Sequence, residues 1–339
     1  MKNIFLAAVL SVILSGCCSN VSDERVVVAY VTSWSSVVPD PCVMTHLNYA
    51  FGHVNDDFDG VRVDNPERLH QMVALKSVNP DLKVLLSVGG WGSGRFSEMA
   101  ADDACRASFA EDCLRVVEEF GLDGIDIDWE YPTSSAAEIS SSPDDTENYT
   151  RLMRDLRKAL GKDRLLTLAS AASAEYIDFR SIMKYVDFVN IMAYDMADAP
   201  KHHSALYESE NSGPITSDMA VKAHVAAGVP IDRLVLGMPF YGRGGSLLTR
   251  FNDYKHVVAD TVYARMWDPV AMVPYLAAED GTLLLGYEDP ASLTIKCRYV
   301  IEEGMLGAMY WDYDGDTAEG DLSRTVAAEI LGYGAPAAE

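Results

Sequence analysis

The residues best suited to chemistry lie in one short stretch, residues 123–132, which reads DGIDIDWEYP. Asp126, Asp128 and Glu130 alternate there with apolar residues, and this alternation predicts a β-strand whose successive side chains point to opposite faces. The three acids would share one face, each roughly 6–7 Å from the next at ~3.3 Å of rise per residue. Because like charges so close raise at least one pKa, one carboxyl can stay protonated and act as a general acid, for example at a glycosidic bond.

The alternative is a solvated acidic strand at the edge of a sheet, without a catalytic role. The neighbouring residues argue against this alternative, because Phe120, Leu122, Ile125, Ile127 and Trp129 describe a buried strand. Carboxylates are costly to bury, and strongly perturbed acids cluster at functional sites. We therefore expect the three acids to belong to a catalytic site.

The rest of the 339-residue chain alternates strand and helix patterns. Eight apolar, β-branched runs predict buried parallel strands at residues 26–31, 46–52, 82–88, 122–130, 164–170, 186–193, 233–240 and 305–311. Helical patterns occupy residues 66–78, 103–120, 144–161, 216–228, 290–303 and 321–332, and the helices after the first and fifth strands are the least distinct. This alternation predicts an α/β fold, a (β/α)8 TIM barrel. The barrel should be one domain over residues 26–334, with a short insertion at about 244–289 between strands seven and eight.

In such a barrel the active site lies at the carboxyl ends of the strands. Polar and aromatic residues gather at these ends: Tyr30, Trp34, Tyr49, Phe51, Ser87, Gly89, Gly90, Trp91, Glu130, Tyr131, Met192, Tyr194, Asp195, Tyr241, Arg243, Trp311 and Asp312. Aromatic rings stack on the C–H faces of sugars, while carboxylates bind their hydroxyls. Tyr49 or Phe51 alone would fit a core position equally well, but the whole set favours a sugar-binding mouth. Asp123, at the other end of its strand and on the opposite face, should be structural.

The chain resembles the glycoside hydrolases of family 18, the chitinase family, over essentially all of residues 26–332. Residues 123–130 carry the DxxDxDxE motif of that family. Two further motifs are present, SxGG at Ser87, Gly89 and Gly90, and MxYD at Met192, Tyr194 and Asp195. The segment 237–243 (GMPFYGR) and Trp311 are also of the family type.

The resemblance implies hydrolysis with retention, in which the 2-acetamido group of the substrate takes the place of an enzyme nucleophile. Glu130 would protonate the leaving oxygen and later activate a water molecule. Asp128 would hold the acetamido N–H, and Asp126 would share a proton with Asp128. Tyr194 would bond the acetamido carbonyl oxygen. The resemblance implies neither a cofactor nor a metal.

The substrate contacts are likewise implied by the resemblance. Asp195, Tyr241 and Arg243 would contact the sugars on either side of the cleaved bond, and Trp311 would floor the subsite of the distorted ring. Tyr30 and Ser87 would lie behind Asp126 and bond it. The other substrate-binding candidates are Phe51, Gly90, Trp91, Tyr131 and Met192.

Substrate assistance requires an N-acetyl group on the sugar at the cleavage point. Candidate substrates are chitin, chito-oligosaccharides, the chitobiose core of N-glycans and peptidoglycan-type glycans. Trp129 and Pro132 resemble the chitinase branch of the family, whereas the endo-β-N-acetylglucosaminidase branch more often has a small or acidic residue in place of Trp129. The expected activity is therefore a chitinase-like cleavage of β-1,4-N-acetylglucosaminide bonds. An endo-β-N-acetylglucosaminidase acting on N-glycans and a catalytically weak, lectin-like glycan binder are the alternatives.

The segment 196–207 after MxYD is less aromatic than in many chitinases, and the insertion is short. Both features favour a shallow groove that takes soluble oligosaccharides. His202 and His203 lie in this segment, but the sequence places no third ligand beside them. We therefore expect surface or hydrogen-bonding histidines rather than a metal site.

The first residues read as a targeting segment. A basic start precedes an apolar run at residues 4–14, which is too short to span a bilayer. The run ends in Leu14-Ser15-Gly16-Cys17, which resembles a bacterial lipobox. We therefore expect residues 1–17 to be a lipoprotein signal, Cys17 to be lipidated, and residues 18–25 to form a polar tether. An ordinary cleaved signal peptide is the alternative.

A lipid at Cys17 would place the protein at the bacterial cell envelope after export, in the periplasm or at the cell surface. The net charge of −24 argues against nucleic acid and against anionic lipid surfaces as partners. The expected partners are a GlcNAc-containing glycan and, through the lipid, a membrane, and we expect a monomer.

Four further cysteines match no metal-binding spacing: Cys42, Cys105, Cys113 and Cys297. Cys105 and Cys113 lie on one predicted helix, about 12 Å of rise apart, which is too far for a disulfide. We expect four buried free thiols, with a Cys42–Cys297 disulfide as the alternative.

Overall fold

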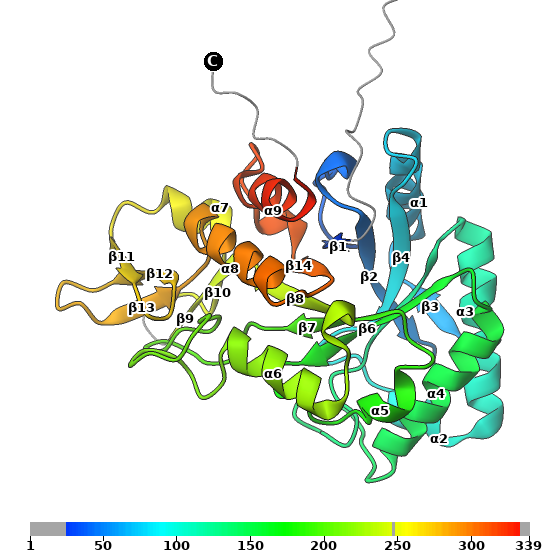
Figure 1. Cartoon of the computed structure of the whole chain (residues 1–339). Coiled ribbons are helices and arrows are strands. Elements are labelled where there is room, and N and C mark those ends of the chain that lie inside the picture. The colour runs from blue at the N-terminus through cyan, green and yellow to red at the C-terminus, as the bar shows by residue number, and fades with distance from the viewer. Residues whose placement is uncertain (1–24, 246–247, 333–339) are drawn as a thin grey trace, which may run out of the picture.

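The computed structural model describes residues 25–245 and 248–332, and eight of its strands form a closed parallel barrel (Figure 1). The strands follow the order β1-β14-β8-β7-β6-β5-β4-β2, and a β1–β2 pairing closes the ring. The barrel strands are β1 (Val26–Thr32), β2 (His46–Val54), β4 (Lys83–Gly89), β5 (Gly124–Asp128), β6 (Leu165–Ala171), β7 (Phe188–Met192), β8 (Leu234–Pro239) and β14 (Gly307–Trp311). The predicted TIM barrel is thus confirmed.

Helices surround the barrel, and most of them match the predicted ranges. They are α1 (Pro66–Ala74), α2 (Phe96–Ala101), α3 (Asp103–Phe120), α4 (Asp145–Leu160), α6 (Ser217–Ala227), α8 (Pro290–Glu302) and α9 (Asp321–Leu331). After the fifth barrel strand, β6, the helix is the single turn α5 (Phe179–Ile182). After β1 the described chain forms only a 3-10 turn, Pro41–Val43. The two helices that the sequence predicts least distinctly are therefore the ones reduced to single turns.

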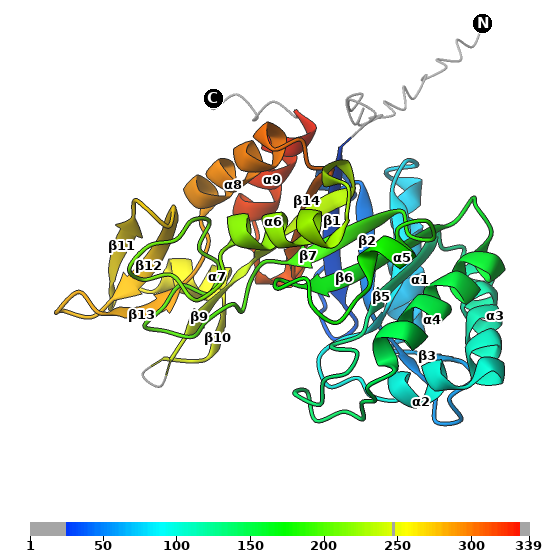
Figure 2. The same cartoon turned by 60° about the horizontal axis from the view of Figure 1, so that its bottom comes forward.

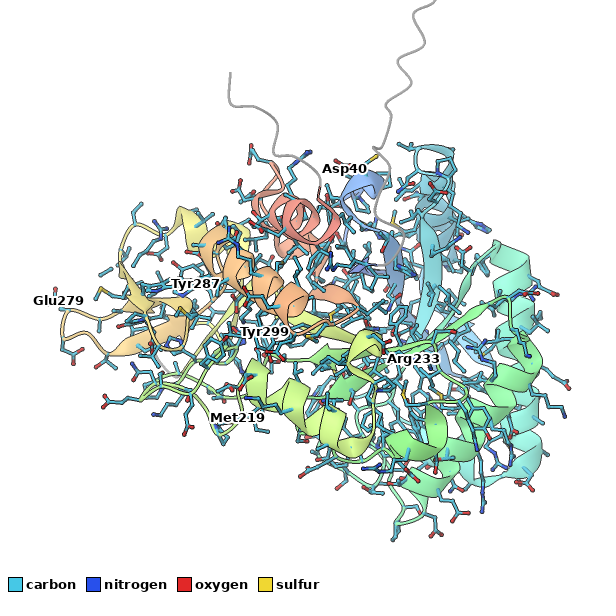
Figure 3. The ribbon with its side chains drawn as sticks, in the orientation of Figure 1. Asp40, Met219, Arg233, Glu279, Tyr287 and Tyr299 are labelled. Atoms are coloured by element: carbon cyan, nitrogen blue, oxygen red, sulfur yellow. The ribbon has the colours of Figure 1, made fainter. Side chains whose placement is uncertain are left out.

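Between β8 and α8 the chain forms a second, antiparallel sheet. Its strands are β9 (Tyr241–Gly244), β10 (Phe251–Asp253), β11 (Ala264–Asp268), β12 (Val273–Ala277) and β13 (Leu283–Gly286), in the order β10-β9-β13-β12-β11, and α7 (Tyr254–Ala259) follows β10. Figure 2 shows this sheet at one side of the barrel. Glu279, labelled in Figure 3, marks the turn between β12 and β13 at the outer end of the sheet. The insertion thus begins at Tyr241, three residues before the expected position.

Strand β5 carries the acids, and its neighbours hold it in place. It pairs in parallel with β4 and β6. Gly124 begins the strand where a Cβ atom would lie 2.1 Å from the Leu165 carbonyl oxygen, so only glycine permits this close approach of β6. Just before the strand, Asp123 accepts the Val84 N–H at 2.7 Å and pairs with Lys76 at 2.6 Å. The expected structural role of Asp123 is confirmed.

The first and last parts of the barrel's sequence lie next to each other, at β1, β14 and α9. Asp40, labelled in Figure 3, accepts a hydrogen bond from Arg324 of α9 at 3.3 Å. Ladders of β1 with both β14 and β2 bring the two ends of the sequence together. In the chain as far as it is described, no helix is long and apolar enough to cross a membrane. The lipoprotein signal, Cys17 and nearly all of the polar tether lie outside the described residues.

The cysteines bear on the disulfide alternative. Cys297 is a free thiol buried on α8, so the Cys42–Cys297 disulfide is absent. Cys113 is also free and buried, whereas Cys105 is free and only partly buried. Cys42 is partly buried as well. The expectation of four buried thiols is therefore wrong for Cys42 and Cys105.

Candidate active site

The three acids of residues 126–130 lie at the carboxyl end of β5. Asp126 and Asp128 are buried on the inner face of the strand. Glu130 is two residues beyond the strand end and only partly buried, so the strand is shorter than the predicted 122–130. Trp129 points the other way and packs between Phe96 and Tyr149, with ring centroids 5.2 Å and 5.9 Å away. The predicted alternation of acidic and apolar faces therefore places Asp126 and Asp128 in the barrel and Trp129 outside it.

Four donors surround the Asp126 carboxylate. Tyr30 and Ser87 each donate a hydroxyl to Oδ2 at 2.8 Å. Thr167 donates its hydroxyl to Oδ1 at 2.6 Å, and Asn190 donates its amide at 3.3 Å. Burial raises the pKa of Asp126, and the four hydrogen bonds oppose that rise.

Two of these donors, Tyr30 and Ser87, follow the expectation from the sequence. Thr167 and Asn190 are not among the contacts of Asp126 that the sequence predicts. Asn190 is the one polar residue of β7, and Thr167 shares the otherwise apolar β6 with one other polar residue, Ser170; both lie at inward positions. That inward position was the only sequence signal that they contact the acids.

Asp128 lies between two other carboxyl groups and has one unsatisfied atom. Its Oδ1 is buried and has no hydrogen-bond partner among the described residues. Burial is the largest cause that raises the pKa of Asp128 well above its ordinary value, followed by the charges of Glu130 and Asp126. An acceptor that is buried without a donor is costly, so this oxygen is suited to receive an N–H from a bound molecule.

Glu130 has the properties of an acid that works near neutral pH. The pKa of Glu130 is raised to about 7: burial is the largest cause, a hydrogen bond with Tyr131 acts to lower the pKa, and the charge of Asp195 acts to raise it. The spacing of the acids predicts such shifts from the crowding of like charges. In the structure, burial is the larger cause for both Asp128 and Glu130, and crowding adds to it.

Aromatic rings form a floor and two flanks around the acids. Trp311 stacks on Phe51 at 5.5 Å and packs against Tyr30 at 5.6 Å. Gly90, at φ 93°, lies where a Cβ atom would be 2.6 Å from the Phe51 ring, so this glycine leaves room for the floor. Trp91, which is 64% exposed, forms the first flank.

The second flank consists of Trp34, and one expected aromatic points elsewhere. Trp34 is 67% exposed, and its ring lies 6.4 Å from Phe51. Tyr49 directs its hydroxyl to the carbonyl oxygens of Asp64 and Asn65, and so belongs to the core around the barrel. Of the pair that the sequence left open, Phe51 is therefore part of the mouth and Tyr49 is not.

Strands β7 and β9 contribute a polar cluster. Tyr241 donates its hydroxyl to Asp195 at 2.6 Å, and Arg243 pairs with Asp195 at 2.6 Å and with Asp198 at 2.5 Å. Burial acts to raise the pKa of Asp195, but the hydrogen bond and charge of His203, with Tyr241 and Arg243, leave it lowered. Asp195 therefore stays ionised near the acids.

Tyr194 and Met192 complete the predicted set at the end of β7. The Tyr194 hydroxyl lies 3.9 Å from the sulfur of Met309, and its ring packs edge-on against Tyr241 at 6.3 Å. Met192 packs in the same inner cluster as Tyr30, Phe51 and the half-buried Trp311. The structure thus brings every predicted catalytic and substrate-binding residue to one end of the barrel.

The two adjacent histidines are buried and hydrogen-bonded. His202 lies 3.3 Å from Asp268 of β11, and His203 lies 3.5 Å from Asp195. The surface alternative is wrong because the antiparallel sheet covers this loop. Across residues 25–245 and 248–332, no group of three or more His, Cys, Asp or Glu side chains could hold a metal ion.

A barrel with a buried carboxyl array at its mouth and aromatic rings around it has the construction of a glycosidase. The chain belongs to glycoside hydrolase family 18, since the family model described as "Glycosyl hydrolases family 18" matches residues 26–316. The protein is a chitinase-like glycosidase of that family.

Known chitinases and an N-acetylglucosaminidase are similar to this chain. The chain is 31% identical to chitinase A1 of Niallia circulans over 92% of its own length, and it spans 60% of that relative. It is 30% identical to chitotriosidase-1 of Mus musculus, covering 87% of this chain and 74% of the relative. Among solved structures, a family 18 N-acetylglucosaminidase from Paenibacillus barengoltzii superposes with a TM-score of 0.82 at 33% identity, covering 91% of this chain and all of the other.

Proposed function

We propose that the protein cleaves β-1,4-linked N-acetylglucosaminides with retention of configuration, using the 2-acetamido group of the substrate as the nucleophile. The observation that carries the proposal is the array Asp126–Asp128–Glu130, with the pKa of Glu130 raised to about 7 at the mouth of the barrel. In family 18 the nucleophile belongs to the substrate, so the enzyme must supply an acid, a base and a partner for the acetamide.

In the first step Glu130 gives its proton to the glycosidic oxygen. The bond from that oxygen to the anomeric carbon breaks, and the acetamido carbonyl oxygen bonds to the same carbon. The acetamido N–H donates to Asp128, whose Oδ1 is buried without a donor among the described side chains. Tyr194, from the end of β7, would donate its hydroxyl to the acetamido carbonyl oxygen and orient it.

In the second step the ionised Glu130 takes a proton from water. The hydroxide bonds to the anomeric carbon from the face that the leaving group vacated, and the bond to the acetamido oxygen breaks. Glu130 regains its proton, and the sugar keeps its original configuration. A pKa of about 7 suits a group that must donate and then accept near neutral pH.

Asp126 would support Asp128 through both steps. Its four donors stabilise a negative charge in the barrel. A proton that Asp128 does not hold can move to Asp126, and the pair titrates as a unit. Trp311, stacked on Phe51, would floor the ring at the cleavage point.

The proposed substrate class is supported by the N-acetyl requirement and by the similarity to relatives described as chitinases and as an N-acetylglucosaminidase. We propose chito-oligosaccharides or other soluble glycans that contain GlcNAc. The test is mass spectrometry of products from protein that begins at Ser19, incubated separately with chitohexaose and with a high-mannose glycoprotein. Short chito-oligosaccharides from chitohexaose alone support the proposal. Glycan released from the glycoprotein, with one GlcNAc left behind, would instead indicate the N-glycan branch.

We also propose that the enzyme is exported and tethered to the cell envelope by a lipid on Cys17. Strand β1 begins at Val26, at the amino ends of the barrel strands and so opposite the acids. The eight tether residues 18–25 would extend at most about 29 Å at ~3.6 Å each. The mouth would then face away from the membrane. Replacing Cys17 by Ala should abolish labelling by radioactive palmitate and release the protein from membranes, and unchanged membrane association would contradict the anchor.

A further inference from the structure

We propose that Asp145 is a positioning residue for Glu130, acting through the loop that joins β5 to α4. The inference rests on the proposed catalytic role of Glu130. Asp145 is the first residue of α4 and lies 15 positions after the acid, and it belongs to none of the motifs that mark the site.

The Asp145 carboxylate is completely buried and accepts three hydrogen bonds. Its Oδ1 accepts the Ser97 hydroxyl of α2 at 2.8 Å. Its Oδ2 accepts the Thr133 N–H at 3.1 Å and the Ser142 N–H at 2.7 Å. One side chain therefore ties the beginning of the loop, the end of the loop and a neighbouring helix to one another.

Capping of α4 does not account for these bonds. The three donors lie outside α4, and the residue at the N-cap position, Asp144, makes no side-chain capping bond. A buried carboxylate is costly unless donors satisfy it. The three donors to Asp145 belong to the loop and to α2, so Asp145 stabilises the loop rather than the end of α4.

The part of the loop that Asp145 holds is strained. Residues 131–134 form a turn closed by the Ser134 N–H and the Tyr131 carbonyl oxygen at 3.1 Å. Thr133 occupies the third position of this turn at φ 66°, where glycine is the usual residue. A β-branched residue in this region is a rare and unfavourable conformation. The bond from Thr133 to Asp145 holds the backbone there.

The strained turn lies directly after Glu130. Tyr131, its first residue, stacks on Tyr176 with ring centroids 5.0 Å apart and meets Trp91 edge-on at 6.4 Å. A hydrogen bond joins Tyr131 to the Glu130 carboxyl. The backbone before Glu130 is fixed by the ladders of β5. The backbone after it depends on this turn, and so on Asp145.

The experiment compares two substitutions that remove the same charge one residue apart. Asp145→Asn keeps the size of the side chain but removes its charge, so the hydrogen bonds from Ser97, Thr133 and Ser142 lose the strength that an ionised acceptor gives them. Asp144→Asn is the matched control, because Asp144 is exposed. Steady-state kinetics on chitohexaose are measured across pH for both variants, with circular dichroism to verify folding.

For Asp145→Asn we expect kcat to fall at least about tenfold with KM within about twofold, since displacing a reacting group by ~1 Å costs about a hundredfold. The basic limb of the kcat/KM profile should also move to lower pH. Loosening the turn admits water to Glu130, and water relieves the burial that raises its pKa. Asp144→Asn should match the wild type. Wild-type kcat in Asp145→Asn, or an equal loss in Asp144→Asn, would overturn the proposal.

A double variant distinguishes a positioning role of Asp145 from a general loss of structure. Thr133→Gly removes the strain of the turn, so Asp145→Asn should lose less kcat in that background than in the wild type. Equal losses in the two backgrounds would overturn the proposal. If Asp145→Asn does not fold, Ser97→Ala removes one bond to the carboxylate and should lower kcat to a smaller extent, and an unchanged kcat there would also overturn it. Activity that survives Glu130→Gln would instead refute the proposed function.

Discussion

Replacing Glu130 by Gln should inactivate the enzyme and at the same time stabilise it, by an amount that depends on pH. The ordinary pKa of a glutamate, 4.5, is raised to about 7 at Glu130. Since each pKa unit is worth about 1.4 kcal/mol, the ionised side chain costs up to about 3 kcal/mol of folding free energy at pH 8. Gln has nearly the same shape and no charge at any pH, so it avoids this cost.

The sign follows from proton linkage. Between pH 4.5 and 7 the folded protein holds the Glu130 proton more tightly than the unfolded chain does, so stability falls as pH rises through that window. Below pH 4.5 both states are protonated and the cost is absent. Glu130→Gln should therefore match the wild type near pH 4 and exceed it by up to about 3 kcal/mol at pH 8.

Urea unfolding at pH 4 and pH 8 measures the difference, and hydrolysis of chitohexaose verifies the loss of activity, which we expect to be about 10²–10⁴-fold. Glu175→Gln is the matched control, because Glu175 is an exposed glutamate on the loop after β6 and should show no such effect. A stability difference that is the same at both pH values would refute the account of Glu130 as a carboxyl group with a raised pKa.

Three further outcomes are expected. The kcat/KM profile of the wild type should lose activity as pH rises through about 7, because the first step needs Glu130 protonated; a profile that is flat from pH 5 to 9 would contradict the assignment. Asp128→Asn should cripple turnover with the fold retained, because it weakens the contact to the acetamido N–H, and wild-type kcat would argue against that contact. Thr167→Val removes a 2.6 Å bond to Asp126; with hydrogen bonds to charged groups worth about 1.5–3 kcal/mol, kcat should fall about tenfold or more, whereas a change in KM alone would place Thr167 in binding.

Much of the site could be predicted from the sequence because its signals are local. Alternation in residues 123–132 requires only that the strand be extended, and it places Asp126 and Asp128 on one face and Trp129 on the other. The eight strand patterns also follow from short apolar runs. The polar residues that follow these strands then meet at one end of the barrel.

The features that the sequence did not reveal depend on contacts between distant segments. Thr167 and Asn190 are polar residues in mostly apolar strands. The pairing of β5 with β6 places Thr167 opposite Asp126, and Asn190 reaches the same carboxylate from β7, two strands away. His203 lies in a loop that the antiparallel sheet buries, so its local sequence allowed a surface position as well as a hydrogen-bonding one. Asp145 gains its role from Thr133, 12 residues away.

The main cause of the pKa shifts also depends on contacts between distant segments, so the sequence did not reveal it. Spacing alone indicates that the charges are close, but the depth of burial depends on the whole barrel. In the structure, burial raises the pKa values of Asp128 and Glu130 more strongly than the neighbouring carboxylates do.

The most direct test of the proposed mechanism is the configuration of the first product. Proton NMR would follow the anomeric signals of the newly formed reducing end during the first minutes of chitohexaose hydrolysis, before mutarotation. The account predicts the β-anomer, because attack by the acetamido oxygen and then by water inverts the same carbon twice. An initial α-anomer would mean a single displacement by water and would contradict the assignment of Glu130, Asp128 and the acetamido group to their roles.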